Sequence, residues 1–260
     1  MARHPRQISS SGIYHVILRG INKQRIFEED ADYQRFLYSM AAVKEKSGCI
    51  FYAYCLMSNH VHILLRTNEE PLALLMKRLA LKYVVWFNAK YERSGHLFQN
   101  RYKSSPVEDE AYFFTVLCYI FQNPVVAKIT KTPAAYKWSS RRLLGKKGSL
   151  IDENALREIV SIDAVIEKDS ELVAESCVAL QSGQKPGRKP RYGDEAVLDM
   201  IATHCGTTSV SAFQALGQSE QKECLSALRR RGVSIRQIAR VTGLSKGVVE
   251  RWCHSRQQVE

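Results

Sequence analysis

The spacing of hydrophobic residues predicts an alternation of strands and helices along the first half of the chain. Runs rich in β-branched and aromatic residues are typical of strands, whereas apolar residues three or four positions apart are typical of helices. Gly20, Gly48 and Gly95 are expected to end elements, and Pro124 to stop the last of these helices. The pattern gives, in order, a strand at 13–18, a helix at 28–46, a hairpin of strands at 50–57 and 60–66, a helix at 72–91, a loop at 97–108 that leads into a strand, and a helix at 111–122.

The order β-α-β-β-α-β-α predicts an α+β fold, in which helices pack on an antiparallel sheet. In the 72–91 helix we expect Leu79, Leu81 and Val85 to belong to the apolar side. The rest of the chain is predicted to be helical and is interrupted by a basic linker that contains proline and glycine. We therefore expect three parts: a first domain at 1–149, an acidic helical segment and linker at 150–191, and an all-helical domain at 192–260.

Composition excludes several classes of protein. Of the 260 residues, 45% are hydrophobic and 25% charged, which are ordinary globular values that exclude a disordered or fibrous chain. No stretch approaches the roughly 20 apolar residues of a membrane span, and no secretory signal pattern is present. The seven cysteines form no CxxC pair, so neither a disulfide framework nor a structural zinc cluster is implied. We expect a cytoplasmic protein with no membrane partner.

The net charge of +12 is unevenly distributed along the chain. Counting charged residues gives +12 for residues 1–149, −6 for 150–184 and +6 for 185–260. Two basic blocks separated by an acidic one suggest two surfaces that contact a polyanion, and a nucleic acid would place the protein at the nucleoid. A merely basic protein surface is the alternative, and composition alone favours neither interpretation.

Two histidines in the predicted 60–66 strand are candidate metal ligands. Side chains alternate along a strand, so His60 and His62 project from one face while Val61 points to the other. Two neutral imidazoles side by side can bind one metal ion, which would satisfy both polar rings in an otherwise apolar strand. The alternative is a pair of hydrogen-bonded histidines at a sheet edge.

The predicted 111–122 helix and the residue after it supply two further candidates. Tyr119 and Asn123 are four residues apart and share a helix face. The amide oxygen of Asn123 could complete a mixed nitrogen and oxygen site, which suits Mg²⁺ or Mn²⁺ holding a substrate phosphate. Tyr119 could then attack a DNA phosphodiester beside the ion, giving a 5′-phosphotyrosine and a 3′-hydroxyl. The alternative for Tyr119 is a packing role, which most of the 12 tyrosines must have.

Several motifs resemble those of one transposase family. The stretch LMSNHVHIL at 56–64 resembles the HUH motif of single-strand-specific tyrosine transposases. The stretches GHLFQNRYK at 95–103, YIFQNPV at 119–125 and YKWSS at 136–140 resemble the REP-associated tyrosine transposases. The motifs occur in the expected order, and the resemblance covers roughly residues 8–145.

This resemblance implies a ferredoxin-like HUH domain that cuts and rejoins single-stranded DNA carrying hairpins such as repeated extragenic palindromes. It implies that His60, His62 and Asn123 bind the metal and that Tyr119 is the catalytic nucleophile. Gln122 is the rival for the third ligand, because related insertion-sequence transposases use glutamine there. We prefer Asn123, since Gln122 is turned about 100° around the helix relative to it. Oligomeric state is not predicted.

A helix-turn-helix is predicted at residues 233–253. Ser234 and Gln237 form a capping-box pattern, Gly243 provides the turn, and Ser245 begins a second helix. The outward residues Ser245, Lys246 and Arg251 are candidates for contact with duplex DNA. An ordinary helical hairpin is the alternative.

Basic residues of the first domain are candidates for contact with single-stranded DNA. Arg19, Arg101 and Lys103 could line a groove for the phosphate backbone, with Tyr14, Tyr102 or Phe98 stacking on bases. The alternative for each residue alone is a surface charge or a core aromatic. The overall prediction is a metal-dependent DNA endonuclease and strand transferase. The rival prediction is a domesticated DNA-binding or regulatory protein whose HUH site is inactive.

Overall fold

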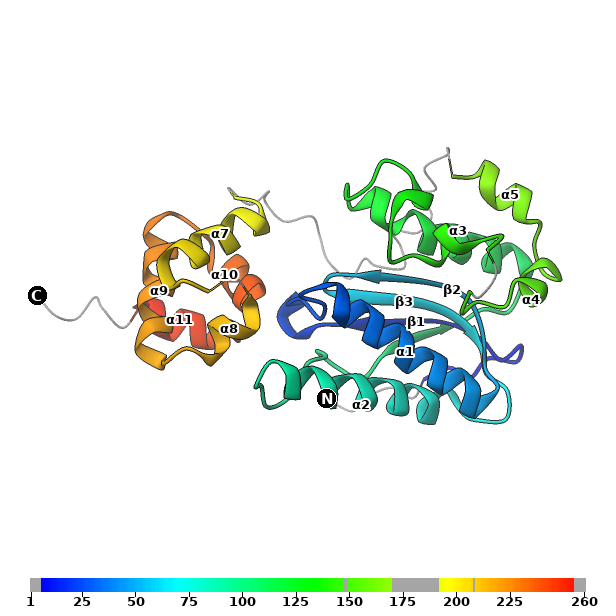
Figure 1. The fold of residues 1–260 in the computed structure, drawn as a ribbon, viewed down its shortest axis with the longest axis horizontal. Helices are drawn as coiled ribbons and strands as arrows, with labels where there is room; N and C mark the ends of the chain where they lie inside the picture. The colour runs from blue at the N-terminus through cyan, green and yellow to red at the C-terminus, as the bar shows by residue number, and fades with distance from the viewer. Residues whose placement is uncertain (1–5, 147–148, 170–191, 208, 255–260) are drawn as a thin grey trace, which may run out of the picture. The chain divides into compact units, whose positions relative to one another are not determined.

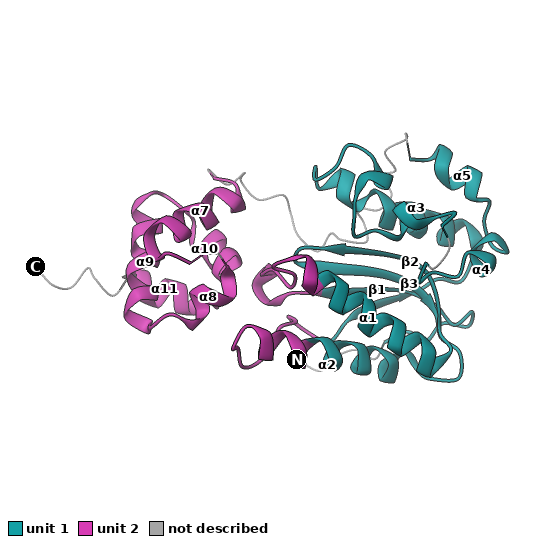
Figure 2. Cartoon of the chain, in the orientation of Figure 1, with its two compact units in different colours: residues 1–18, 33–83, 101–185 teal, residues 19–32, 84–100, 186–260 magenta. Residues whose placement is uncertain are grey.

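The structure, a computed structural model, describes residues 6–146, 149–169, 192–207 and 209–254. The predicted linker at 185–191 lies outside these ranges, as do residues 170–184 of the predicted acidic segment, so the division into three parts stays a prediction. The chain forms two compact units, shown in different colours in Figure 2. Unit 1 comprises residues 1–18, 33–83 and 101–185, and unit 2 comprises residues 19–32, 84–100 and 186–260.

A four-stranded sheet organises the N-terminal half of the chain (Figure 1). Its strand order is β2-β3-β1-β4, the order of a ferredoxin-like fold, and it confirms the predicted α+β class. β2 pairs antiparallel with β3, and β1 pairs antiparallel with β4. In the hairpin Met57 lies opposite His60, so Ser58 and Asn59 form the predicted tip. The strands are β1 Ile13–Arg19, β2 Ile50–Met57, β3 His60–Arg66 and β4 Lys103–Pro106.

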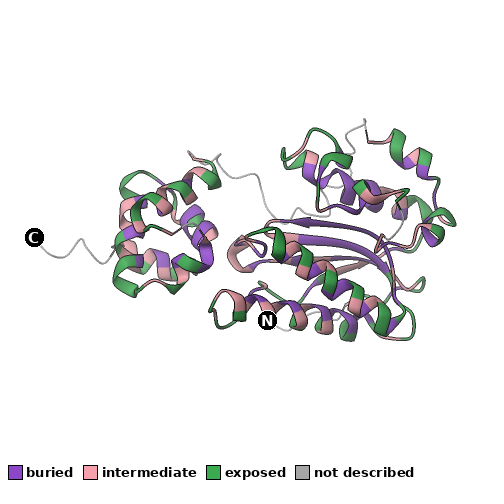
Figure 3. Cartoon of the chain, in the orientation of Figure 1, coloured by how far each residue is buried: buried purple, intermediate pink, exposed green. Residues whose placement is uncertain are grey.

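Three helices cover the two faces of this sheet. Figure 1 shows α1 (Asp30–Ser47) and α2 (Leu72–Lys90) along one face and α3 (Glu110–Val126) along the other. β2 and β3 are buried along most of their length (Figure 3). Leu64 of β3 belongs to the hydrophobic core formed with α3. Because side chains alternate along a strand, the even-numbered residues of β3, including His60 and His62, share the α3 face with Leu64.

α3 extends past the predicted stop at Pro124. Proline lacks an N–H, and its ring disturbs the carbonyl four residues earlier, here that of Ile120. Pro124 lies only two residues from the helix end, so a single bond is lost. The N–H of Ala127 donates to the carbonyl of Asn123 at 3.0 Å, which keeps the chain helical to Val126. Asn123 is therefore held inside a helix.

The predicted apolar side of α2 is partly wrong. Leu79, Tyr83 and Phe87 are fully buried, whereas Leu81 and Val85 are 58% and 61% exposed. Each helical residue turns the side chain by 100°, so Leu81 lies 200° from Leu79 and must face away from the sheet. The buried residues keep the three- and four-residue spacing of an amphipathic helix.

The remaining described elements are short helices. Three 3₁₀ helices connect larger elements, and α4 and α5 add to the core beside α3. The last described part of the chain is all-helical, as predicted, with its own core around Phe213, Leu225 and Ile238. The 3₁₀ helices are η1 Ile21–Lys23, η2 Pro133–Ala135 and η3 Ser140–Leu143, and the helices are α4 Glu153–Arg157, α5 Ile162–Glu167, α7 Asp194–Cys205, α8 Val210–Ala215, α9 Gln218–Arg230, α10 Ile235–Thr242 and α11 Lys246–His254. None of the described helices combines the length and the apolar character that a membrane crossing requires.

Candidate active site

The two histidines of β3 lie side by side on the face of the sheet that α3 covers. The ring centroids of His60 and His62 are 5.0 Å apart, and the rings are nearly perpendicular. His62 is completely buried, whereas His60 is half-buried. The strand thus presents both imidazoles on one face of the sheet, with His62 in the interior and His60 at the partly exposed start of the strand.

α3 brings Asn123 and Tyr119 to the same point. The side-chain oxygen Oδ1 of Asn123 is 3.4 Å from Nε2 of His60, and its Nδ2 is 3.4 Å from Nε2 of His62. Tyr119 lies one helical turn earlier, with its ring centroid 5.3 Å from that of His62. Tyr119 is 7% exposed and Asn123 is 5% exposed. The four side chains that the sequence singled out therefore gather in one place.

Gln122, the rival ligand, has a different environment. Its Nε2 donates a hydrogen bond to the backbone carbonyl of Lys168, at the end of α5, over 2.8 Å. Its amide is thus used to hold α5 against α3. Asn123 contacts both imidazoles and Gln122 contacts a carbonyl, which favours Asn123 for the third ligand.

Two residues that the sequence reasoning missed contact the imidazoles from outside. His15 of β1 places Nε2 3.0 Å from Nδ1 of His62, and Asn59 places Oδ1 2.6 Å from Nδ1 of His60. Burial lowers the pKa of His15 to about 4, so its ring is neutral near pH 7. A histidine inside the apolar run of the first strand was a signal, because a buried imidazole needs a partner.

The donor atoms fit a divalent cation. Oδ1 of Asn59 can only accept, so Nδ1 of His60 carries a proton, and in the tautomer protonated at that nitrogen alone Nε2 offers a lone pair beside Oδ1 of Asn123. Two acceptors facing each other at 3.4 Å are satisfied by a cation between them. Adjacent ligands of an octahedral ion with bonds of about 2.1 Å lie about 3 Å apart, which is close to this spacing.

The mixed nitrogen and oxygen donors distinguish this arrangement from an ordinary cysteine or carboxylate site. Among the residues that the structure describes, no group of three or more His, Cys, Asp or Glu side chains could hold a metal ion. The candidate ligands beside His60 and His62 instead include the amide oxygen of Asn123, 3.4 Å from Nε2 of His60. Such a donor set suits Mg²⁺ or Mn²⁺ bound to a phosphate.

The predicted contacts with single-stranded DNA have mixed outcomes. Arg101 and Lys103 are exposed, and Arg19 is half-buried at the end of β1. Tyr14 and Tyr102 are 7% and 8% exposed, which fits the alternative that they are core aromatics, whereas Phe98 is half-buried. Tyr14 lies within β1, and Tyr102 directly precedes β4.

The C-terminal helix pair has most of the predicted local geometry, except that the side-chain nitrogen of Gln237 donates to Tyr192 and Asp194 instead of completing a capping box. Ser234 accepts a hydrogen bond from the N–H of Gln237, and Gly243 adopts the left-handed conformation with φ of 71°. Ser245 accepts from the N–H of Val248 at 3.2 Å and begins α11. Lys246 and Arg251 are exposed, as predicted for contact residues. Nζ of Lys246 also lies 2.9 Å from Glu250, an exposed pair that holds the side chain weakly.

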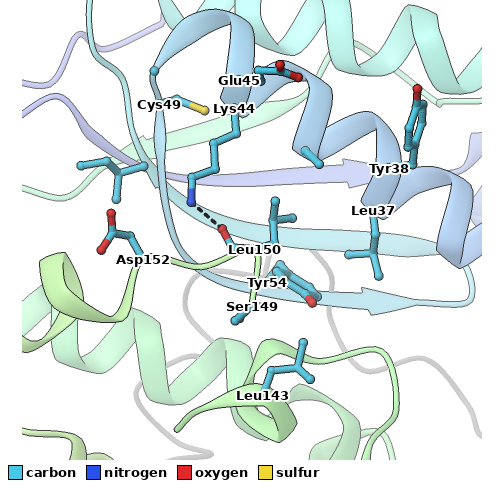
Figure 4. Close-up of a pocket in the computed structure, with 13 residues that line it drawn as sticks. Leu37, Tyr38, Lys44, Glu45, Cys49, Tyr54, Leu143, Ser149, Leu150 and Asp152 are labelled. Carbon is cyan, nitrogen blue, oxygen red and sulfur yellow. Dashed lines mark hydrogen bonds between the residues drawn. The ribbon is translucent and has the colours of Figure 1, made fainter. Parts of the chain in front are cut away.

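A separate cavity of about 750 Å³ lies between α1, the start of β2 and the segment before α4 (Figure 4). Leu37 and Tyr38 line it from α1, and Lys44 reaches across it to donate to the carbonyl of Leu150 at 2.9 Å. None of the predicted site residues lines this cavity. The candidate metal ligands and the candidate nucleophile instead lie on β3 and α3.

The fold and this gathering define a class of protein: a ferredoxin-like domain with paired histidines on a central strand and a tyrosine on the covering helix. Residues 8–123 match the sequence profile of the family described as IS200-like transposases. Over these residues the chain is therefore similar to the IS200-like transposases. The match ends at Asn123 and so includes all four gathered residues.

Two solved structures are similar to this chain. One is a REP-associated tyrosine transposase bound to a REP hairpin, with 14% identity and a TM-score of 0.49, covering 63% of this chain and 90% of that one. The other is a protein of Deinococcus radiodurans described as a candidate transposase, with 14% identity and a TM-score of 0.34, covering 49% and 98%. No curated protein sequence matches the chain.

Proposed function

We propose that this chain is a metal-dependent tyrosine endonuclease and strand transferase that acts on hairpin-bearing single-stranded DNA, as REP-associated transposases do. The observation that carries the proposal is the meeting of Tyr119 and Asn123 with His60 and His62. A packing tyrosine or a structural histidine pair would not require this combination. The motifs at 56–64 and 119–125 support the same assignment.

In the proposed reaction, the hydroxyl oxygen of Tyr119 attacks a phosphodiester in line with the 3′ oxygen. The bond from phosphorus to the tyrosine oxygen forms, the bond to the 3′ oxygen breaks, and the phenolic proton ends on the leaving 3′-hydroxyl. His60, His62 and Asn123 would hold Mg²⁺ or Mn²⁺, which polarises the phosphate and stabilises the developing charge when bound. The helix positions Tyr119 one turn from Asn123, so nucleophile and ligand are oriented by the same rigid element.

Rejoining reverses the same chemistry. A 3′-hydroxyl from another strand attacks the phosphotyrosine, and the tyrosine oxygen leaves with the proton. The covalent phosphotyrosine intermediate conserves the free energy of the phosphodiester bond, so rejoining needs no nucleotide cofactor. Transfer to a different 3′-hydroxyl gives strand transfer, the step that a transposase requires.

The C-terminal helices are proposed as a second DNA contact. Ser245, which directly precedes α11, and Lys246 and Arg251 on α11 would meet a duplex, with the protein at the nucleoid in the cytoplasm. Arg251→Ala should weaken duplex binding several-fold and reduce the slope of log affinity against log salt by about 1. Cleavage of a short hairpin should be unchanged, with Arg157→Ala as the matched control at an exposed arginine of α4. Equal duplex affinity for Arg251→Ala and the unaltered protein would remove Arg251 from this surface.

The deciding experiment is incubation of the full-length protein with a labelled hairpin-bearing single strand, followed by a denaturing gel. In Mg²⁺ or Mn²⁺ we expect a protein–DNA adduct and a shorter strand with a free 3′-hydroxyl. Chelation by EDTA should abolish both, and added Mn²⁺ should restore them, because the proposed cation polarises the phosphate and stabilises the developing charge. Adduct formation at full yield in EDTA would contradict the proposed role of the metal.

A further inference from the structure

His15 contacts Nδ1 of His62, whereas Asn123 lies beside the other ring nitrogen of His62, Nε2. Nε2 of His15 is 3.0 Å from Nδ1 of His62, and the two rings stack with centroids 5.2 Å apart and planes 22° apart. His15 is 2% exposed, on β1, which lies next to β3 in the sheet. The contact is therefore built into the pleated core of the sheet and excludes water.

The hydrogen bond between two imidazoles restricts where their protons lie. One nitrogen of the pair must donate and the other must accept. Nε2 of His62 lies 3.4 Å from the amide nitrogen of Asn123, which can only donate, so Nε2 is an acceptor and the proton of His62 lies on Nδ1. Nε2 of His15 then accepts that proton's hydrogen bond, and His15 carries its own proton on Nδ1.

We propose that His15 is a positioning residue that holds His62 in the Nδ1–H tautomer and aims its Nε2 lone pair at the metal, an inference that rests on the proposed function. Histidines that bind metals commonly donate their second ring nitrogen to an outer partner, which fixes both the tautomer and the ring orientation. Asn59 acts in the same way on His60 through Oδ1, at 2.6 Å. The two ligands are thus oriented by different partners, one in the core and one at the hairpin tip.

A direct role of His15 in proton transfer from Tyr119 is the competing assignment. The ring centroids of His15 and Tyr119 are 5.9 Å apart, close enough for a contact. However, Nε2 of His15 is already the acceptor for His62, and the His62 ring lies nearer to Tyr119, at 5.3 Å. A proton acceptor for Tyr119 would change the rate of cleavage at saturating metal, whereas a positioning residue changes the affinity for metal.

The test measures binding of Mn²⁺ alone to the full-length protein, from the electron paramagnetic resonance signal of unbound Mn²⁺. His15→Leu removes the acceptor and should raise the Mn²⁺ dissociation constant about 10- to 100-fold. His15→Gln should stay within about threefold of the unaltered protein, because its side-chain oxygen reaches the place of Nε2 and accepts from His62. Melting temperatures without metal show whether each variant is folded.

A second measurement does not depend on any variant. Nitrogen-15 spectra of the imidazoles in the metal-free protein should show His62 with its proton on Nδ1. His62 protonated on Nε2, or a folded His15→Leu protein with unaltered Mn²⁺ affinity, would overturn the inference. Absence of Mn²⁺ binding by the unaltered protein would count against the proposed metal site itself, and the tautomer of His62 would then decide the role of His15.

Discussion

Tyr119→Phe is expected to abolish the covalent protein–DNA adduct while leaving the fold and the binding of a hairpin intact. The substitution removes only the hydroxyl that would attack the phosphorus, and the ring keeps its place 5.3 Å from that of His62. Loss of a nucleophile should lower the cleavage rate by at least about 10³-fold, which corresponds to about 4 kcal/mol of transition-state stabilisation. The measurement is adduct yield with time on a denaturing gel, beside hairpin affinity in the absence of metal.

Tyr112→Phe is the matched control for this substitution. Tyr112 lies two helical turns earlier on the same helix, and its ring is partly buried beside the core. Its loss of a hydroxyl should leave the adduct yield unchanged. Normal adduct formation by Tyr119→Phe would mean that a different tyrosine is the nucleophile.

The second large effect is expected at Asn123. Asn123→Ala removes the amide that lies 3.4 Å from both imidazoles, so the Mn²⁺ concentration for half-maximal cleavage should rise on the order of 100-fold. Adding Mn²⁺ should restore part of the activity, because His60 and His62 remain. The measurement is adduct yield across a Mn²⁺ titration, with the melting temperature as a check on folding.

Gln122→Ala provides the comparison at the neighbouring residue. It removes a hydrogen bond to the carbonyl of Lys168, which should cost about 1 kcal/mol of stability. Its metal requirement should stay close to that of the unaltered protein, because the amide nitrogen donates to the carbonyl of Lys168. The opposite ranking of Asn123→Ala and Gln122→Ala would transfer the ligand role to Gln122.

The sequence was most informative where local pattern alone decides the geometry. The period of two in β3 places His60 and His62 on one face whatever the rest of the chain does, and the four-residue spacing places Tyr119 and Asn123 on one side of α3. The hairpin bounds were correct because a two-residue polar tip between apolar strands fixes the register. That these two faces meet depends on the packing of α3, which the resemblance implied and the structure displays.

The predictions failed where tertiary contacts outweigh local preference. The contact of His15 with His62 joins residues 47 positions apart, and no local pattern specifies which strand will neighbour β3. The helix was predicted to stop at Pro124. It continues because the cost of a proline depends on its position in the helix, and Pro124 lies only two residues before the end of α3. Leu81 was assigned to the core from its hydrophobicity, although its angle on α2 directs it to solvent.

The placement of all four gathered residues on β3 and α3 of a single chain has a consequence for stoichiometry. A molecule that carries Tyr119 also carries the histidines and the amide beside it, so nothing must be borrowed from a second copy. Mixing a protein that carries a substitution at Tyr119 with one that carries a substitution at His60 should therefore restore no cleavage. Activity per molecule should also remain constant on dilution.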